Sequence, residues 1–306
     1  MSLIQYLKPN GPSGFGYGST AEQVTEGLDV SGRTVLVTGC NSGIGLETAR
    51  VLALRGARVI GTARSLEKAS AACAPFPAAV PLACELADPA SVRDCVARVR
   101  DLGVRLDALV CNAGIMALPR LERAHGIELQ LFTNHVGHFM LVTGLLDRLA
   151  DDGRVVVVSS GAHRQAPREG IQFDNLSGEK GYGPWAAYGQ SKMANLLFAK
   201  ELARRLAGTR RTANAVHPGV IRTNLGRHMS PDAHALFGMV GPLFLKDAAQ
   251  GAATQTWAAV HPGAARVSGA YLADCNVAPC RADADDPALA GRLWTVTEEI
   301  VARLPG

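Results

Sequence analysis

A short apolar strand comes directly before a glycine turn and a helix in this chain. The run 33–39 is rich in β-branched residues and ends at Gly39, as expected of a buried parallel strand. Gly43 and Gly45 follow, and apolar residues then recur at helical spacing. Glycines let a pyrophosphate approach the backbone, and the helix N-terminus offers unpaired N–H groups. A plain tight turn also uses glycines, but the flanking strand and helix favour a dinucleotide site.

Strands and helical patterns alternate along the rest of the chain, the longest helical pattern lying at 122–149. This order predicts one doubly wound α/β domain of the Rossmann type, with a mostly parallel seven-stranded sheet and helices on both faces. We expect the domain to span 31–306, after an N-terminal arm, 1–30, that holds a short helix at 20–27. The predicted strands are 33–39, 57–62, 79–83, 106–111, 154–160, 212–216 and 270–272.

Composition and charge narrow the class of protein. Hydrophobic residues make up 47% of the 306 residues and charged residues 19%, which is ordinary for a soluble globular chain. The net charge of +4 is spread along the sequence, so nucleic acid is not an expected partner. The seven cysteines lack a C-x-x-C pair and favour reduced thiols. Without a signal peptide or a membrane-spanning apolar run, we expect a cytoplasmic protein with no membrane anchor.

The end of the second strand bears on the choice of cofactor. In dinucleotide-binding folds an acidic residue at this place accepts a hydrogen bond from the ribose 2′-hydroxyl, whereas an arginine suits a 2′-phosphate. The chain has no acid here, and Arg64 follows the strand. This favours NADP, although a single arginine after a strand is often only a surface charge.

Tyr188 and Lys192 are four residues apart on a predicted helix, so their side chains share one face. A fixed positive charge favours the phenolate and lowers the tyrosine pKa, which would make Tyr188 a general acid or base. Taken alone, such a pair is more often a solvated helix face. Upstream, the fifth strand ends in Ser159 and Ser160, at the sheet edge where ligands sit in parallel sheets.

These motifs together resemble the short-chain dehydrogenase/reductase family, from about residue 30 to the end. The resemblance is closest to the branch of retinol dehydrogenases and the WW-domain oxidoreductase. The motifs that carry it, in chain order, are Thr38-Gly-x-x-x-Gly-Ile-Gly45, Asn112-Ala-Gly114, Ser160, Tyr188-x-x-x-Lys192 and Pro218-Gly219 with Thr223.

The resemblance implies four catalytic residues. Tyr188 would protonate the carbonyl oxygen in reduction or remove the hydroxyl proton in oxidation. Lys192 would hold the nicotinamide ribose and lower the tyrosine pKa, and Ser160, rather than Ser159, would hydrogen-bond the reacting oxygen. Asn134 would support a water-linked proton path from the lysine.

The resemblance also implies a set of cofactor-binding residues. Two departures stand out: Glu85 replaces the usual aspartate beside the adenine, and no basic residue precedes Gly43. Preference for NADP(H) therefore depends on Arg64 and the missing acid. The implied cofactor residues are Gly39, Ser42, Gly43 and Ile44 at the phosphates, Arg64 at the 2′-phosphate, Glu85 and Leu86 beside the adenine, and Asn112 and Ala113 near the adenosine side. The set continues with Gly114, Tyr188, Lys192, Pro218 and Gly219, and ends with Val220 and Thr223 at the carboxamide end.

Two segments should decide the substrate. The stretch 161–187 is long, and 222–246 is apolar enough for a lid over a hydrophobic carbonyl substrate, or for ordinary helix packing. His163 is a candidate substrate contact or, more simply, a surface histidine. No metal site is expected, because His135 and His138 have no third ligand in a recognisable pattern.

The leading hypothesis is an NADP(H)-dependent oxidoreductase that interconverts an apolar aldehyde or ketone with its alcohol. One alternative is a catalytically silent NADP(H)-binding regulatory or scaffold protein, and another is a sugar-nucleotide epimerase or dehydratase. The resemblance implies pairing through the tyrosine helix, hence a homodimer or homotetramer, which terminal extensions could block.

Overall fold

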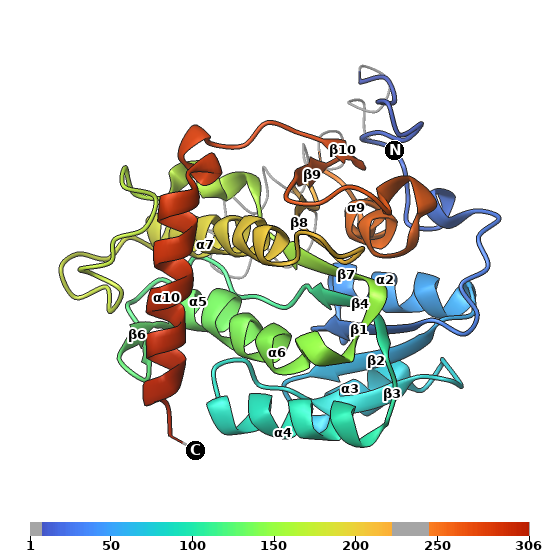
Figure 1. The fold of residues 1–306 in the computed structure, drawn as a ribbon, viewed down its shortest axis with the longest axis horizontal. Helices are drawn as coiled ribbons and strands as arrows, with labels where there is room; N and C mark the ends of the chain where they lie inside the picture. Colours follow the sequence, from blue (N-terminus) through green and yellow to red (C-terminus); the bar gives the residue numbers. More distant parts are fainter. Residues whose placement is uncertain (1–7, 222–244, 306) are drawn as a thin grey trace, which may run out of the picture.

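The computed structural model describes residues 8–221 and 245–305. Within those residues the main sheet has eight strands in the order β10-β9-β8-β7-β4-β1-β2-β3 (Figure 1). Every neighbouring pair is parallel except β9 and β10. The strands are β1 Thr34–Thr38, β2 Arg58–Ala63, β3 Val80–Ala83, β4 Leu106–Cys111, β7 Leu149–Val158, β8 Thr212–His217, β9 Tyr271–Ala273 and β10 Asn276–Val277.

The doubly wound sheet is therefore confirmed, with one more strand than the seven predicted. The extra strand, β10, pairs antiparallel with β9 across a tight turn. Asp274 and Cys275 form this turn, with φ of 51° and 62°. Neither residue is a glycine, and other residues seldom adopt positive φ. The sequence therefore gives no local signal for a hairpin here.

Helices cover both faces of the sheet. On one face α4, α6 and α7 pack against Leu36 and Leu109, and on the other α2, α3 and α9 pack against Val35 and Val37. The side chains of successive β1 residues thus point into two apolar layers, one on each face of the sheet, as expected of a fully buried strand. The helices are α2 Gly43–Leu54, α3 Leu66–Cys73, α4 Pro89–Asp101, α5 Leu129–Leu131, α6 Gly137–Leu145, α7 Pro184–Arg205, α9 Ala248–Val260 and α10 Pro287–Arg303.

The single long helix predicted at 122–149 is wrong at its start. A small hairpin, β5 Arg123–Ala124 with β6 Ile127–Glu128, occupies that region instead. His125 and Gly126 turn it with φ of 49° and 80°. After α5, the segment Phe132–Val136 is π-helical before α6 begins. Such a wide turn is common at functional sites, and it holds Asn134.

The N-terminal segment packs against the sheet domain. The helix predicted at 20–27 is reduced to a 3₁₀ turn, Gln23–Thr25, because Gly27 leaves the helical region with φ of 72°. Ala21 is fully buried, and its amide donates to the carbonyl of Ala249 at 2.8 Å. The division into an arm, 1–30, and a domain, 31–306, stays a prediction.

Candidate active site

Four parallel strands end at one edge of the sheet. Thr38 of β1 pairs with Thr62 of β2, and Cys111 of β4 pairs with Val157 of β7. The chain continues from β1 to β2 on one side, whereas β4 lies on the other. This reversal of strand order between β1 and β4 opens the crevice in which doubly wound sheets bind their ligands.

The glycine turn fits a pyrophosphate. Gly39 and Gly43 have φ of 68° and 56°, and a Cβ at Gly45 would lie 2.2 Å from the carbonyl oxygen of Gly39. These three positions therefore need glycine. Ser42 is the N-cap of α2, and its side chain caps none of the described N–H groups. The exposed amides of the first turn are thus free for an anion. Ile44 follows in the same turn.

Thr38 joins the glycine turn to the end of β4. Its Oγ1 accepts from the amides of Asn112 and Ala113 at 2.9 and 3.0 Å. Its hydroxyl lies 2.9 Å from Nε2 of His138, to which it donates. The Asn112 side chain donates in turn to the Thr38 carbonyl at 2.8 Å. Asn112 and Ala113, predicted to touch the adenosine side, are thus tied into a brace beneath the turn.

The adenosine side is predicted at the ends of β2 and β3. Arg64 is exposed and has no hydrogen-bond or ion-pair partner among the described residues. The Glu85 carboxylate accepts from the Ala87 amide at 3.1 Å, so one of its oxygens is already hydrogen-bonded within the turn that contains Glu85. Leu86 is buried, and its carbonyl oxygen lies 2.3 Å from where a Cβ on Gly137 would be.

Lys192 and Tyr188 lie together on α7. The Lys192 ammonium is buried, donates to the carbonyl of Val158 at 3.0 Å and lies 5.7 Å from the centre of the Tyr188 ring. A Cβ on Gly114 would be 3.5 Å from it, so the glycine after β4 lies directly beside the ammonium. Ser159 donates to the Lys192 carbonyl at 2.7 Å. Because the Ser159 hydroxyl is occupied, the adjacent Ser160 is the serine that can hydrogen-bond a substrate.

Burial, more than charge, sets the pKa values of this pair. It raises the pKa of Tyr188 to about 12, partly offset by a hydrogen bond with Ser160. Burial also lowers the pKa of Lys192 to about 8. Burial thus opposes the lowering of the tyrosine pKa that was expected from Lys192, and that role of Lys192 stays a prediction. Desolvation disfavours the charged phenolate and so raises the tyrosine pKa.

Asn134 acts here as a clamp. Its amide accepts from the Ile115 N–H at 2.8 Å and donates to the Ile115 carbonyl at 2.9 Å. It also donates to the hydroxyl of Ser191 at 2.9 Å. The loop after Gly114 is thereby fixed to α7. The role of Asn134 in a proton path stays a prediction.

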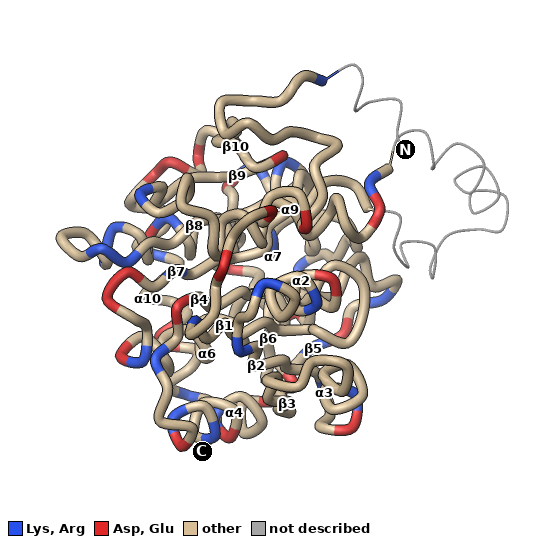
Figure 2. The backbone as a smooth tube through the Cα atoms, turned by 90° about the vertical axis from the view of Figure 1, so that its right-hand side faces the viewer, with Lys and Arg blue, Asp and Glu red and all other residues tan. Residues whose placement is uncertain are grey.

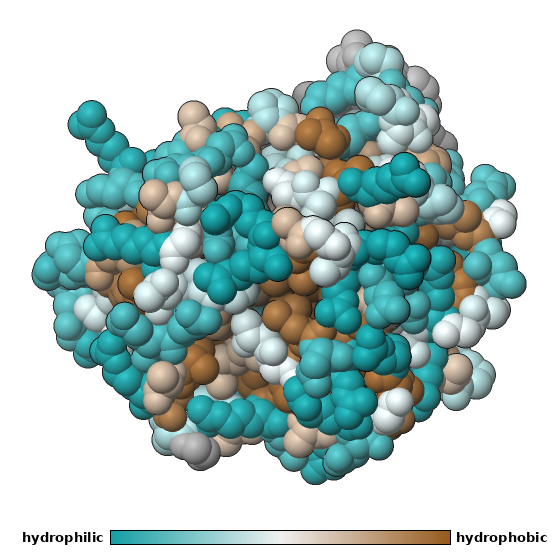
Figure 3. All heavy atoms as spheres, viewed as in Figure 1, coloured by the Kyte–Doolittle hydropathy of each residue, from teal (hydrophilic) through white to brown (hydrophobic). Residues whose placement is uncertain are grey.

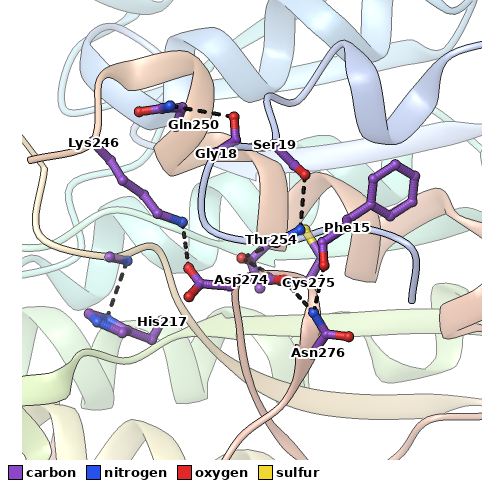
Figure 4. A network of polar contacts seen from close by, with 12 residues as sticks. Phe15, Gly18, Ser19, His217, Lys246, Gln250, Thr254, Asp274, Cys275 and Asn276 are labelled. Atoms are coloured by element: carbon purple, nitrogen blue, oxygen red, sulfur yellow. Dashed lines mark hydrogen bonds and ion pairs between the residues drawn. The ribbon is translucent and has the colours of Figure 1, made fainter. Parts of the chain in front are cut away.

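The turn after β8 completes the site. Gly219 has φ of 94°, and Val220 is 53% exposed. Lys246 supports the turn: it is fully buried, its amide donates to the Val220 carbonyl, and its ammonium pairs with Asp274 at 2.7 Å (Figure 4). Pro218 precedes Gly219. Thr223 and residues 222–244 of the predicted substrate segment lie outside the described residues.

Comparisons with known proteins agree with this geometry. The family model described as "short chain dehydrogenase" matches residues 33–234. The chain belongs to the short-chain dehydrogenase/reductase family. It is 41% identical to "Short-chain dehydrogenase TIC 32 A, chloroplastic" of Brassica napus, over 96% of this chain and 97% of that one. It is 37% identical to human "Retinol dehydrogenase 14", over 94% and 92%.

A solved structure extends the likeness. The "Short chain dehydrogenase from Burkholderia cenocepacia J2315 in complex with NADP" has a TM-score of 0.63 and 28% identity, over 80% of this chain and 96% of that one. The predicted resemblance to the family, near its retinol dehydrogenase branch, is thus confirmed. Members of the family use nicotinamide cofactors. Among the residues that the structure describes, no helix is long and apolar enough to cross a membrane.

The structure of this short-chain dehydrogenase/reductase corrects the prediction for His163. This residue is fully buried, neither on the surface nor free to touch substrate. Its Nδ1 donates to the Ser160 carbonyl at 2.6 Å, and its Nε2 accepts from the Arg281 amide at 3.2 Å. His135 and His138 are also buried, and the described residues hold no cluster of metal-ligating groups.

Sequence reasoning missed two supporting residues of this dehydrogenase/reductase. The first is Thr38, whose only signal in the sequence is its place as the first residue of the glycine motif. Gln255 of α9 is fully buried and donates to Thr48 at 2.6 Å and to the Asn112 side chain at 3.2 Å. Nothing in the local sequence marks Gln255, because its partners lie on α2 and at the end of β4.

Proposed function

We propose that the protein is an NADP(H)-dependent oxidoreductase that interconverts an apolar carbonyl compound and its alcohol. The observation that carries the proposal is the buried Lys192 ammonium, which lies 5.7 Å from the Tyr188 ring centre and directly beside Gly114. Burying a charged lysine costs free energy, so a lysine kept in such a place indicates a functional site. Here the charge lies where a phenol can exchange a proton.

The nicotinamide, when bound, supplies or accepts the hydride. Tyr188 donates its proton to the carbonyl oxygen in the reducing direction and takes it back in oxidation. Lys192 stabilises the phenolate that remains after proton donation, because its charge is fixed beside the ring. Ser160 offers its hydroxyl to the same oxygen and so orients the substrate.

Arg64 supports NADP(H) over NAD(H). Its exposed guanidinium follows β2, where a 2′-phosphate would lie, and no carboxylate stands at that strand end to bind a free 2′-hydroxyl. The structural neighbour from Burkholderia cenocepacia was solved with NADP. Gly39, Ser42, Gly43 and Ile44 would take the phosphates.

Exposed apolar side chains near Tyr188 support an apolar substrate. Trp185 is 50% exposed and meets the Tyr188 ring edge-on, at 6.1 Å between ring centres. Val220 is exposed in the turn after β8. Several relatives bear the name retinol dehydrogenase, which denotes an apolar alcohol. The cytoplasmic location stays a prediction.

The test is turnover with NADPH and a panel of aldehydes, ketones, steroids and quinones. We expect activity on apolar members of the panel and a loss of at least about 1,000-fold in kcat for Tyr188→Phe. NADPH binding, followed by its fluorescence, should persist in the variant. Turnover that survives the substitution would remove the mechanism. NADPH binding by the wild type without any turnover would favour the silent scaffold.

A further inference from the structure

His217, the last residue of β8, connects two turns of the candidate site. Its Nδ1 accepts from the Gly161 amide at 3.2 Å and from the Gly219 amide at 3.4 Å. Two N–H donors on one ring nitrogen require that nitrogen to be unprotonated, so the ring proton is on Nε2. Burial and the nearby Lys246 lower the pKa of His217 to about 4. The ring is therefore neutral near pH 7, and its lone pair is available.

The two amides belong to the two sides of the proposed reaction. Gly161 directly follows Ser160, which would hold the reacting oxygen. Gly219 lies in the turn expected at the carboxamide end of the cofactor. β7 and β8, which precede these turns, are paired through Val158 and Val216. One more backbone hydrogen bond follows, from the Ser159 amide to the Val216 carbonyl at 2.8 Å. Beyond it, the side chain of His217 links the two segments.

Neighbouring rings hold His217 in place. The Tyr271 ring is parallel to it within 9°, at 6.4 Å between centres. The edge of Tyr271 meets His163 at 4.9 Å, and His163 donates to the Ser160 carbonyl. The peptide group between Ser160 and Gly161 is thus held by two histidines, His163 at its carbonyl and His217 at its amide, with Tyr271 as the spacer between them. In Figure 4, His217 lies below the ion pair of Lys246 and Asp274.

We propose that His217 is a positioning residue that fixes the Ser160 turn relative to the Pro218-Gly219 turn. Through it, the hydroxyl that binds the reacting oxygen keeps its place relative to the carboxamide end of the cofactor. Misplacement of a reacting group by about 1 Å can cost about 100-fold in rate. This inference rests on the proposed function, because it assigns Ser160 and the turn their roles.

The experiment compares three substitutions at one position. In His217→Asn the side-chain oxygen lies near the place of Nδ1 and can accept the same two amides. In His217→Gln the acceptor moves toward the place of Nε2, and in His217→Leu it is absent. We expect Leu and Gln to lower kcat about 10- to 100-fold and to raise the KM for NADPH. Asn should recover most of both losses.

Equal activity of Asn and Gln would overturn the proposal, and so would wild-type kinetics in all three variants. If His217→Leu does not fold, the Asn and Gln pair still decides, because both are polar and of similar size. Thermal melts of each variant separate lost positioning from lost folding. A loss that tracks the melting temperature alone would count against positioning.

A second background tests whether His217 acts through the serine. In Ser160→Ala, the further change His217→Leu should alter kcat less than about threefold, while NADPH binding should still weaken. Fully multiplicative losses in kcat would overturn the route through Ser160. Failure of the proposed function looks different, since wild-type turnover would then be absent or would survive Tyr188→Phe. The NADPH affinities of the His217→Asn and His217→Gln variants would still test whether His217 links the two turns.

Discussion

Tyr188 and Lys192 are both shifted toward their neutral forms by burial. The phenol has its pKa raised to about 12 and the amine has its pKa lowered to about 8. Across the neutral range the tyrosine therefore keeps its proton, ready to donate, and the lysine keeps its charge. This combination suits reduction, in which Tyr188 is the acid.

The pH dependence of reduction follows from these shifts. Lys192 is charged below about pH 8 and loses its charge above it, whereas Tyr188 stays protonated up to about pH 12. We expect kcat/KM for carbonyl reduction to be level from pH 6 to 7.5 and to fall about tenfold per unit above pH 8. In Lys192→Arg the charge persists, so the remaining activity should not fall up to pH 10. A fall of the same size in Lys192→Arg would contradict the assignment.

Arg64 gives a test of cofactor choice. We expect Arg64→Ala to weaken NADPH binding about tenfold or more and NADH binding less than threefold, because only NADPH has a 2′-phosphate to pair with. The measurement is a fluorescence titration with each cofactor. Arg58, at the other end of β2, is the matched control, and Arg58→Ala should change neither affinity. Equal losses for both cofactors would show that Arg64 does not bind the phosphate.

Among the elements, the connection from β1 to α6 has the greatest consequence for the site. Thr38 donates to His138, and Nδ1 of His138 donates to the carbonyl of Asn134 at 2.9 Å. Asn134 in turn clamps Ile115 beside Gly114. The glycine turn, the end of β4 and the π-helical segment thus share one set of buried hydrogen bonds. The turn proposed to bind the cofactor is thus tied to the π-helical segment that holds the loop after Gly114.

Thr38→Val tests this connection. The substitution keeps the shape and leaves the amide of Ala113 and Nε2 of His138 without their described partner. Each buried group left unpaired costs about 1–3 kcal/mol, so we expect a loss of about 2–4 kcal/mol in the free energy of unfolding. Thr38→Ser keeps the hydroxyl and should lose about 1 kcal/mol or less. Urea unfolding measures both, and equal losses would contradict the role of the hydroxyl.

At the scale of the whole molecule, α10 covers the outer face of α6 and α7. In Figure 1 it crosses these helices, and Trp294 packs against Phe139, Phe198 and the guanidinium of Arg205. Seen from this side, the surface is largely hydrophilic (Figure 3). The resemblance implied pairing of subunits through the tyrosine helix, α7. Because α10 occupies that face, we expect any pairing to use another surface.

Trp294 measures how firmly α10 is held. It is 5% exposed and lies at the centre of the aromatic cluster, so Trp294→Ala should cost about 3–5 kcal/mol in the free energy of unfolding. Trp185→Ala is the control, since that ring is half-exposed and should cost less than about 1 kcal/mol. Urea titrations compare the two. A small effect at Trp294 would mean that α10 docks loosely.

Acidic and basic residues alternate over the molecule, as Figure 2 shows on one side. Many form ion pairs, among them Arg98 with Asp94 and Arg100 with Asp147. These pairs are exposed and contribute little to stability individually. The mixed charge matches the modest net charge of the sequence.

The sequence by itself determined the alternation of strands and helices, the glycine turn and the spacing of Tyr188 and Lys192. Each depends on short-range features: the period of apolar residues, glycines where φ is positive, and two side chains one helical turn apart. The bounds of β4 were predicted without error for the same reason. The hairpin at 123–128 was missed because a positive φ at His125 has no strong local signal.

Tertiary structure alone decided which side chains support the site. Thr38 meets His138 across 100 positions, and His163 meets Arg281 across 118. The pKa values of Tyr188 and Lys192 likewise depend on burial, which many distant segments create together. Local patterns specify backbone shape over a few residues, whereas desolvation and hydrogen-bond partners depend on how the whole chain packs.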